Sequence, residues 1–230
     1  QVMNKLRFYF FHLMPYPHIP PSTEIASSWV SLSNKHYDPQ RGRLLYNEYI
    51  EQLVAAEKHG FDGVGVNEHH ANFYGTMPSP NIIAAMLVQR TSHIPIGVIG
   101  NAIPLHGNPL RVAEEIAMLD VISGGRIISG FVRGIGCEYF NNGVTPADSV
   151  ERFDEAHDLI IKAWTDDGPF TWQGDHFYVP NANIIPKPIQ QPHPPIWIPG
   201  QGSLETLQFV ARHHYTYMMV FAPLWFTKMA

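Results

Sequence analysis

Four short segments of polar residues and glycines each follow directly after an apolar run of strand length. Histidine exchanges protons near neutral pH, and arginine forms charge-assisted hydrogen bonds with phosphate oxygens. If the four segments meet at one edge of a sheet, they could hold a phosphorylated ligand and move a proton beside it. The segments are Asn67-Glu68-His69-His70, Gly100-Asn101-Ala102, Arg133-Gly134-Ile135-Gly136 and Gly200-Gln201-Gly202-Ser203.

The last of these segments predicts a phosphate site. Residues 200–203 place backbone N–H groups and the Ser203 hydroxyl at the start of a predicted helix, which is what binding a phosphate requires. Arg133 could add a charge-assisted contact, and Gly134 would let a ligand approach the backbone closely. The alternative is that the glycines only form tight turns.

His69 could be a general acid or base, or a histidine whose hydrogen bonds are satisfied in the core. A metal site is not expected, because His69 and His70 are neighbours on an extended segment and point to opposite sides. His12 has no second histidine two residues away, and the chain has no His-Glu-x-x-His motif.

Several function classes are disfavoured by the rest of the sequence. A net charge of −5 without basic runs argues against nucleic-acid binding. Gly134-Ile135-Gly136 lacks the third glycine of a dinucleotide fingerprint, and neither a P-loop nor a Gly-x-Ser-x-Gly motif is present. The single cysteine, Cys137, excludes an internal disulfide, and no apolar stretch is long enough to span a bilayer. We therefore expect a soluble cytoplasmic protein whose partner is a small molecule.

Apolar patterning and turn residues predict strands that alternate with helices. Gly60 and Gly124 mark helix ends, and Pro109 suits the first turn of a helix. Residues 170–195 are rich in proline and are expected to be irregular. The expected strands are 6–14, 61–66, 94–99, 126–132, 196–199 and 217–221, and the expected helices are 44–59, 81–90, 110–122, 149–164 and 204–213.

Alternating strands and helices imply a parallel α/β sheet, either a (β/α)8 TIM barrel or an open doubly wound sheet. The barrel is favoured, because residues 15–21 after the first strand contain prolines and no glycine-rich nucleotide turn. About six of the eight strands of a barrel are present. We expect a single domain over residues 1–230, truncated before the last βα units.

A series of short motifs, in this order along the chain, resembles the bacterial luciferase-like flavin-dependent monooxygenase family. They cover nearly the whole sequence. They are Phe61-Asp62-Gly63, Glu68-His69-His70, residues 105–115, Leu119-Asp120, residues 123–126 and 130–134, Glu151-Arg152-Phe153, Pro186-Lys187-Pro188 and Pro194-Pro195-Ile196-Trp197.

The resemblance implies a luciferase-type barrel that binds reduced FMN at its mouth, receives it from a separate flavin reductase, forms a homodimer and uses O2 to oxidise a small organic substrate. It assigns His69 a role in catalysis. It also implies that the backbone after the third strand, sometimes with a cis peptide that does not involve proline, meets the flavin ring. We assign His12, Val132 and Tyr139 to the substrate pocket. The implied cofactor contacts are Asn101, Arg133, Gly134, Gln201, Gly202, Ser203 and Thr206.

This chain departs from the light-emitting members at several positions. Val132 stands where they have a reactive cysteine, and Cys137 is displaced from that position. Light emission is therefore not expected. Pro199 and Gln201 also differ from the luciferase pattern, which affects the individual phosphate contacts that the resemblance implies. Two alternatives to the monooxygenase remain open, namely hydride transfer with coenzyme F420 and a non-catalytic flavin-binding protein. The substrate class stays open.

Overall fold

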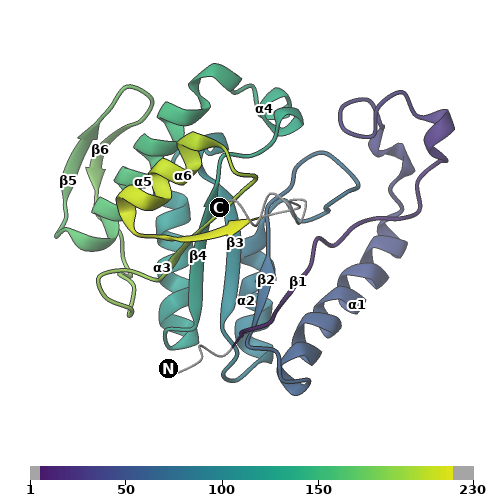
Figure 1. The fold of residues 1–230 in the computed structure, drawn as a ribbon, viewed down its shortest axis with the longest axis horizontal. Helices are drawn as coiled ribbons and strands as arrows, with labels where there is room; N and C mark the ends of the chain where they lie inside the picture. The colour runs from purple at the N-terminus through teal and green to yellow at the C-terminus, as the bar shows by residue number, and fades with distance from the viewer. Residues whose placement is uncertain (1–5, 220–230) are drawn as a thin grey trace.

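The computed structural model describes residues 6–219, and six parallel strands form its centre. Figure 1 looks into the concave inner face of this sheet, with α2 and α3 behind the strands and β8 crossing in front. The strands pair in chain order, and β1 and β8 form the edges. They are β1 (Tyr9–Phe11), β2 (Gly63–Val66), β3 (Ile96–Ala102), β4 (Ile127–Val132), β7 (Ile196–Gly200) and β8 (Thr216–Met219).

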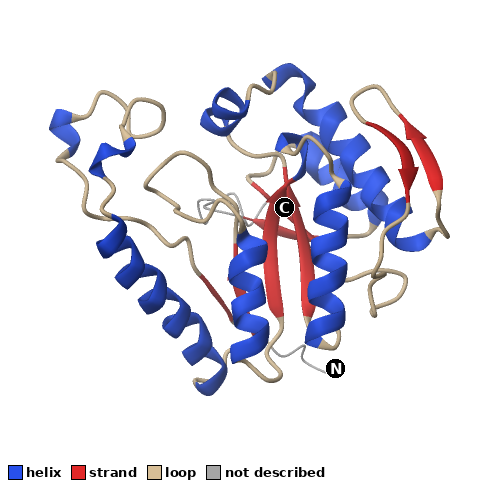
Figure 2. Ribbon diagram, turned by 180° about the vertical axis from the view of Figure 1, so that it is seen from behind, coloured by secondary structure: helices blue, strands red, loops and turns tan. Residues whose placement is uncertain are grey.

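Helices connect these strands and cover the convex face of the sheet. In Figure 2, seen from behind, α2 and α3 stand side by side in front of the central strands, and α1 lies next to α2 on the side of β1. The five predicted helices are therefore confirmed, and the curled parallel sheet of six strands has the form expected of an incomplete (β/α)8 barrel. The helices are α1 (Pro39–Lys58), α2 (Pro80–Arg90), α3 (Leu110–Ser123), α5 (Ser149–Thr165) and α6 (Leu204–His213).

Alternate residues of the central strands build the core between the sheet and the helices. Val64 and Val66 pair in register with Ile96 and Val98, and all four side chains are fully buried. Side chains along a strand alternate between its two faces, so the intervening residues point to the inner face. Burial of branched apolar side chains on the convex face thus determines which residues face the barrel interior.

Glycines on the inner face allow close packing between strands. A Cβ atom on Gly100 would lie 2.6 Å from the backbone of Gly130, and one on Gly130 would lie 2.6 Å from the Val98 carbonyl oxygen. The Tyr9 ring occupies the space beside Gly63 and packs edge-on against Trp197, with 5.0 Å between ring centroids. Large and small residues therefore alternate inside the curled sheet.

Capping residues define the ends of the helices. Asp38 caps α1 by accepting hydrogen bonds from the backbone N–H groups of Gln40 and Arg41. Gly124 ends α3 in the left-handed conformation, with φ of 69°, where a side chain would be strained. Because Pro39 suits a first helical turn, α1 begins there, five residues before the predicted start at Leu44.

Two strands and a short helix are absent from the sequence prediction. Residues 170–195, expected to be irregular, contain the antiparallel pair β5 (Phe170–Gln173) and β6 (Tyr178–Ala182), which packs against α5. A short helix, α4 (Gly136–Asn142), follows β4. Strand β1 is shorter than predicted and ends at Phe11. Residues 220 and 221 of the last predicted strand lie outside the described residues.

Short 3-10 helices complete the connections. They are η1 (Ser22–Glu24), η2 (Asn34–His36), η3 (Ile103–Leu105) and η4 (Pro146–Asp148). Over residues 6–219, none of the helices has the length and apolar character that would be needed to cross a bilayer.

Candidate active site

The four segments singled out in the sequence lie at the carboxyl ends of strands of one parallel sheet, and residues 100–102 are the last residues of β3 itself, so all four lie at the same end of the sheet. Two contacts connect segments that are far apart in the chain. His69, after β2, contacts Glu138 in α4, and Arg133, after β4, contacts Ser203 at the start of α6. The predicted proton carrier and the predicted phosphate contacts therefore share the carboxyl edge of the sheet.

His69 is held by a buried carboxylate. Its Nδ1 atom lies 2.8 Å from Oε1 of Glu138, and the Glu138 residue is only 1 % exposed. A carboxylate can only accept, so Nδ1 carries the proton in this contact and Nε2 is the ring nitrogen that can accept a proton. The contact thus fixes both the orientation and the tautomer of the imidazole.

Glu138 is itself oriented by backbone donors. Its Oε2 accepts from the N–H of Ile135 at 2.9 Å, and its Oε1 accepts from the N–H of His70 at 3.2 Å. Sequence reasoning missed Glu138, because α4 has only seven residues and no helix is predicted between residues 132 and 149. An acidic residue within a first helical turn after Gly134-Ile135-Gly136 was the available signal.

A second buried carboxylate, Glu68, joins the segments that follow β2 and β3. Its Oε1 lies 2.6 Å from Nε2 of His70, and its Oε2 accepts from the N–H of Ala102 at 3.0 Å. Nε2 of His106 and Nδ2 of Asn101 each lie 3.4 Å from the same oxygen. His69 and His70 therefore contact different carboxylates, as expected for neighbours on an extended segment.

The pKa shifts of the Glu68–His70 pair have opposite signs. Burial acts to raise the pKa of Glu68, but hydrogen bonds from His106 and His70 outweigh it and hold the pKa at about 2. The hydrogen bond to Glu68 raises the pKa of His70 above its ordinary value, against the effect of burial. The pair thus favours a charged carboxylate and a protonated imidazole.

The side chain of Asn101 is buried and connects β3 to α2. Its Nδ2 atom also lies 3.3 Å from Oδ1 of Asn81, whose amide donates to Glu115. Oδ1 of Asn101 and Oδ1 of Asn67 are buried without a hydrogen-bond partner among the described residues. Unpaired buried acceptors are costly, so each of these oxygens could accept from a donor on a bound ligand. The Ile99–Gly100 peptide, which precedes Asn101, is cis.

The predicted phosphate contacts form one group. Arg133 Nη2 donates to Ser203 Oγ at 3.3 Å, and Ser203 Oγ lies 2.9 Å from Thr206 Oγ1. Ser203 caps α6, and the helix dipole adds a partial positive charge there. The Gly202 N–H donates to the Tyr217 hydroxyl at 2.7 Å, which fixes the turn and occupies that donor.

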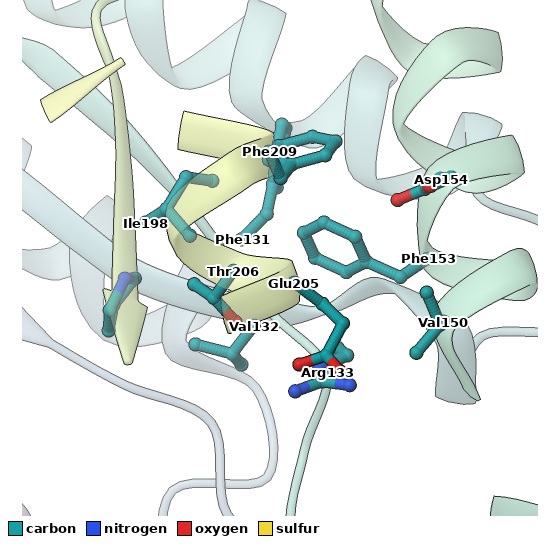
Figure 3. A pocket seen from close by; sticks show the side chains of 11 residues that line it. Phe131, Val132, Arg133, Val150, Phe153, Asp154, Ile198, Glu205, Thr206 and Phe209 are labelled. Carbon is teal, nitrogen blue, oxygen red and sulfur yellow. The ribbon is translucent and has the colours of Figure 1, made fainter. Parts of the chain in front are cut away.

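A pocket adjoins this group between α5, α6 and the ends of β4 and β7, as Figure 3 shows. Arg133 and Thr206 reach it from two sides. Asp154 and Glu205 also line the pocket, so carboxylates partly offset the positive charge of Arg133. The apolar lining consists of Phe131, Val132, Val150, Phe153, Ile198, Pro199 and Phe209.

The three residues assigned to the substrate pocket lie in different places. Val132 lines the pocket beside Arg133. Tyr139 is buried in α4, burial raises the pKa of its hydroxyl, and the charge of Arg133 acts on it in the opposite direction. His12 follows β1 and contacts α1, with Nε2 at 3.2 Å from Gln52 Oε1 and its ring packed on Tyr49.

The remaining predicted cofactor residues shape the backbone of the rim. Gly134 has φ of +92°, and a Cβ atom there would lie 3.2 Å from Glu138 Oε2, so glycine is required next to the carboxylate that holds His69. Gln201 is exposed in the bend between β7 and α6. Within residues 6–219, no cluster of three His, Cys, Asp or Glu side chains is arranged to hold a metal ion.

Comparison with known families identifies the family of the chain. A family model described as luciferase-like monooxygenase matches residues 27–229, which is most of the chain. The chain belongs to this family. Its sequence relatives include protein y4wF of Sinorhizobium fredii, 37 % identical over 169 residues that cover 71 % of this chain and 48 % of the relative. The oxygenase component of the flavin-dependent trigonelline monooxygenase of Acinetobacter baylyi is 32 % identical and covers 70 % and 45 %.

Solved structures have the same fold. The oxygenating constituent of 3,6-diketocamphane monooxygenase from Pseudomonas putida, in complex with FMN, matches with a TM-score of 0.74 and 17 % identity. The match covers 94 % of this chain and 57 % of that one. An F420-dependent secondary alcohol dehydrogenase matches with a TM-score of 0.70 and 22 % identity over 94 % and 58 %. The chain spans about half the length of the curated relatives it matches.

Proposed function

We propose that this luciferase-like protein is a monooxygenase that uses reduced FMN and O2 to oxidise a small organic substrate. The observation that supports it most directly is the contact between Arg133 and Ser203. These residues come from turns 70 positions apart, yet they present a guanidinium, a hydroxyl and a helix N-terminus to one point. The His69–Glu138 pair lies on the same rim.

Arg133, Ser203 and Thr206 would hold the FMN phosphate, with Gly134, Gln201 and Gly202 beside it. The Gly202 N–H is already bonded to Tyr217, so the side-chain donors carry most of the phosphate binding. Asn101 would meet the ring system, whose N–H groups suit the unpaired Oδ1 atoms of Asn101 and Asn67. Reduced FMN, when bound, supplies the electrons that activate O2.

His69 would manage protons at the reacting centre. Glu138 keeps Nδ1 protonated, so Nε2 can accept a proton and return it later. The buried carboxylate also stabilises the imidazolium formed in between, as a carboxylate behind a catalytic histidine does in other enzymes. Val132, Tyr139 and His12 stay proposed as substrate-pocket residues, of which Val132 is the one that lines the pocket beside Arg133.

The same proposal includes a separate flavin reductase as partner, a homodimer and a cytoplasmic location. The trigonelline enzyme is named as an oxygenase component, which supports a division of labour between two proteins. An exposed apolar stripe on α2 and α3, which includes Ile82, Met86 and Ile122, supports the homodimer.

A titration of the protein with FMN, reduced FMN and F420, following absorbance and oxygen together, tests the cofactor and the reaction type. We expect reduced FMN to bind and to give rapid oxygen uptake that depends on substrate. Anaerobic reduction of F420 by an alcohol, without FMN binding, would replace the proposal with hydride transfer. Flavin binding without any oxygen or hydride chemistry would leave a non-catalytic flavin-binding protein.

Substitution of Arg133 tests the phosphate contact. Arg133→Ala should weaken FMN binding by about 1.5–3 kcal/mol, roughly tenfold to a hundredfold, because a charge-assisted hydrogen bond is lost. Riboflavin, which has no phosphate, should bind wild type and variant equally. Equal dissociation constants of the two proteins for FMN would contradict the contact.

A further inference from the structure

Two exposed aromatic side chains stand in a row with His69. The Tyr74 ring meets the imidazole edge-on, with 5.2 Å between centroids and 68° between planes. The Trp29 ring lies 5.3 Å from the Tyr74 ring at 48°. Trp29 is 41 % exposed and Tyr74 is 36 % exposed. The row therefore leads from the imidazole at the rim to the surface of the protein.

The loop that carries Tyr74 is tightly anchored. The backbone N–H and the hydroxyl of Thr76 both donate to the Met14 carbonyl, at 3.0 and 2.7 Å, and His69 N–H donates to the Met77 carbonyl at 3.1 Å. A Cβ atom on Gly75 would lie 2.8 Å from the His69 ring, so this turn packs directly against the imidazole. The backbone thus fixes the position of Tyr74 relative to His69.

Other aromatic residues pack the inner side of this loop. Tyr16 and Phe73 fill the space beneath the loop, with ring centroids 5.6 Å apart, and both are buried. Single exposed aromatic residues are common on protein surfaces. Two of them in mutual contact, from separate segments and next to the rim histidine, instead form a small aromatic surface that is free to bind a ligand.

We propose that Trp29 and Tyr74 form a wall of the substrate site and that the substrate carries a flat aromatic ring. This rests on the proposed function, since it places the substrate beside His69. Aromatic faces and edges attract one another in offset or edge-to-face geometries, beyond what burial of apolar area contributes. A flat ring can use both the Trp29 and the Tyr74 surfaces, whereas a puckered ring or an alkyl chain gains burial only.

Binding of matched neutral probes tests the substrate class. 2-Naphthol and 2-decalol share a bicyclic skeleton with one hydroxyl, but only the first is flat, and decanal represents an alkyl chain. Ligand-observed NMR titrations with FMN present measure the three affinities. We expect 2-naphthol to bind wild-type protein roughly threefold to tenfold more tightly than 2-decalol and decanal.

Variants show which residues cause the preference for 2-naphthol over 2-decalol and decanal. Trp29→Leu and Tyr74→Leu should each remove most of it, whereas Tyr74→Phe keeps the ring and should retain it. Tyr178→Leu, on exposed β6, is the matched control and should bind all probes as wild type does. Thermal unfolding of each variant shows whether it is folded, and exposed positions such as these should tolerate the change.

Wild-type protein that binds 2-naphthol and 2-decalol equally would overturn the inference. A preference that survives unchanged in both leucine variants would overturn it as well. An FMN titration of the same samples separates the two proposals. If the wild type binds FMN but shows no preference for the flat ring, only the inference about the substrate is wrong. If the wild type binds no FMN, the proposed function is wrong. In that case the leucine variants still show whether Trp29 and Tyr74 bind the aromatic ring.

Discussion

At the residue scale, the geometry of the His69–Glu138 pair leads to a direct test. His69→Ala should lower turnover by roughly 10² to 10⁴ and leave the FMN dissociation constant nearly unchanged, because proton transfer contributes that much in rate. Glu138→Gln should lower turnover less and shift its pH profile, since the amide cannot stabilise an imidazolium. His93→Ala, at an exposed histidine, is the control. Unchanged turnover in His69→Ala would exclude the role.

The Glu68–His70 pair predicts a pH window of stability. The pKa of Glu68 is held at about 2, below its ordinary 4.5, so its contribution is complete above pH 4.5 and is lost as the pH falls towards 2. The pKa of His70 is raised above 6.5, so its contribution is complete below 6.5 and is lost as the pH rises through the folded value. Denaturant midpoints should therefore be highest between these limits.

A variant of matched size tests how much of this pH dependence comes from the Glu68–His70 pair. Glu68→Gln keeps the size of the side chain but removes the charge that the imidazoles of His70 and His106 contact. The pH dependence of the denaturant midpoint should therefore flatten between pH 5 and pH 8. A midpoint that varies with pH in the variant as it does in wild type would assign the dependence to other groups.

Residues at strand ends could be found from the sequence, and residues that support them could not. His69, Arg133 and Ser203 stand where an apolar run stops, and in a parallel sheet such positions share one edge. Glu138 lies in a helix too short to show apolar periodicity. The partners of Glu68 come from its own segment and from residues 101–106, and no local pattern indicates which carboxylate an imidazole will contact.

At the element scale, Arg126 connects the start of β4 to the end of α2 and the turn before β3. Its guanidinium donates to the carbonyls of Val88, Thr91 and Ile94, at the end of α2 and before β3. A cation at a helix C-terminus also interacts favourably with the dipole. Arg126→Met should therefore cost about 2–4 kcal/mol of the free energy of unfolding, because it leaves these carbonyls without donors.

The control for that prediction is another arginine. Arg90 forms an exposed pair with Glu51, at 2.7 Å, and Arg90→Met should cost no more than about 1 kcal/mol because solvent screens such pairs. Denaturant unfolding of both variants measures the difference. Similar losses would show that the buried donors of Arg126 contribute little beyond an ordinary surface charge.

The elements that the sequence predicted well are those with long apolar periodicity and clear punctuation. The β5–β6 pair escaped prediction because its strands are short, exposed on one face and surrounded by prolines. Its position depends instead on Glu155, which accepts from the Trp172 indole and from the N–H groups of His176 and Phe177. Such anchoring by a distant side chain leaves no pattern in the local sequence.

At the scale of the whole molecule, the outer face of α2 and α3 is unusually apolar. This pair of helices is flanked by α1, next to α2, and by α5, next to α3. A strand or helix added at the edge strands β1 or β8 would therefore not cover the outer face of α2 and α3. A second copy of the chain can cover the stripe. Its exposed side chains are Ile82 and Met86 on α2 and Met118, Val121 and Ile122 on α3.

A charge placed in that stripe should therefore separate the subunits. Met86→Glu and Ile122→Glu should convert a dimer to a monomer, because a carboxylate buried in an apolar interface costs several kcal/mol. Light scattering after size-exclusion chromatography measures the mass, and Leu44→Glu, on exposed α1, should leave it unchanged. A wild-type protein that elutes as a monomer at all concentrations would reject this interface. Because both helices begin near the rim of the sheet, dissociation should also weaken FMN binding if the dimer supports the site.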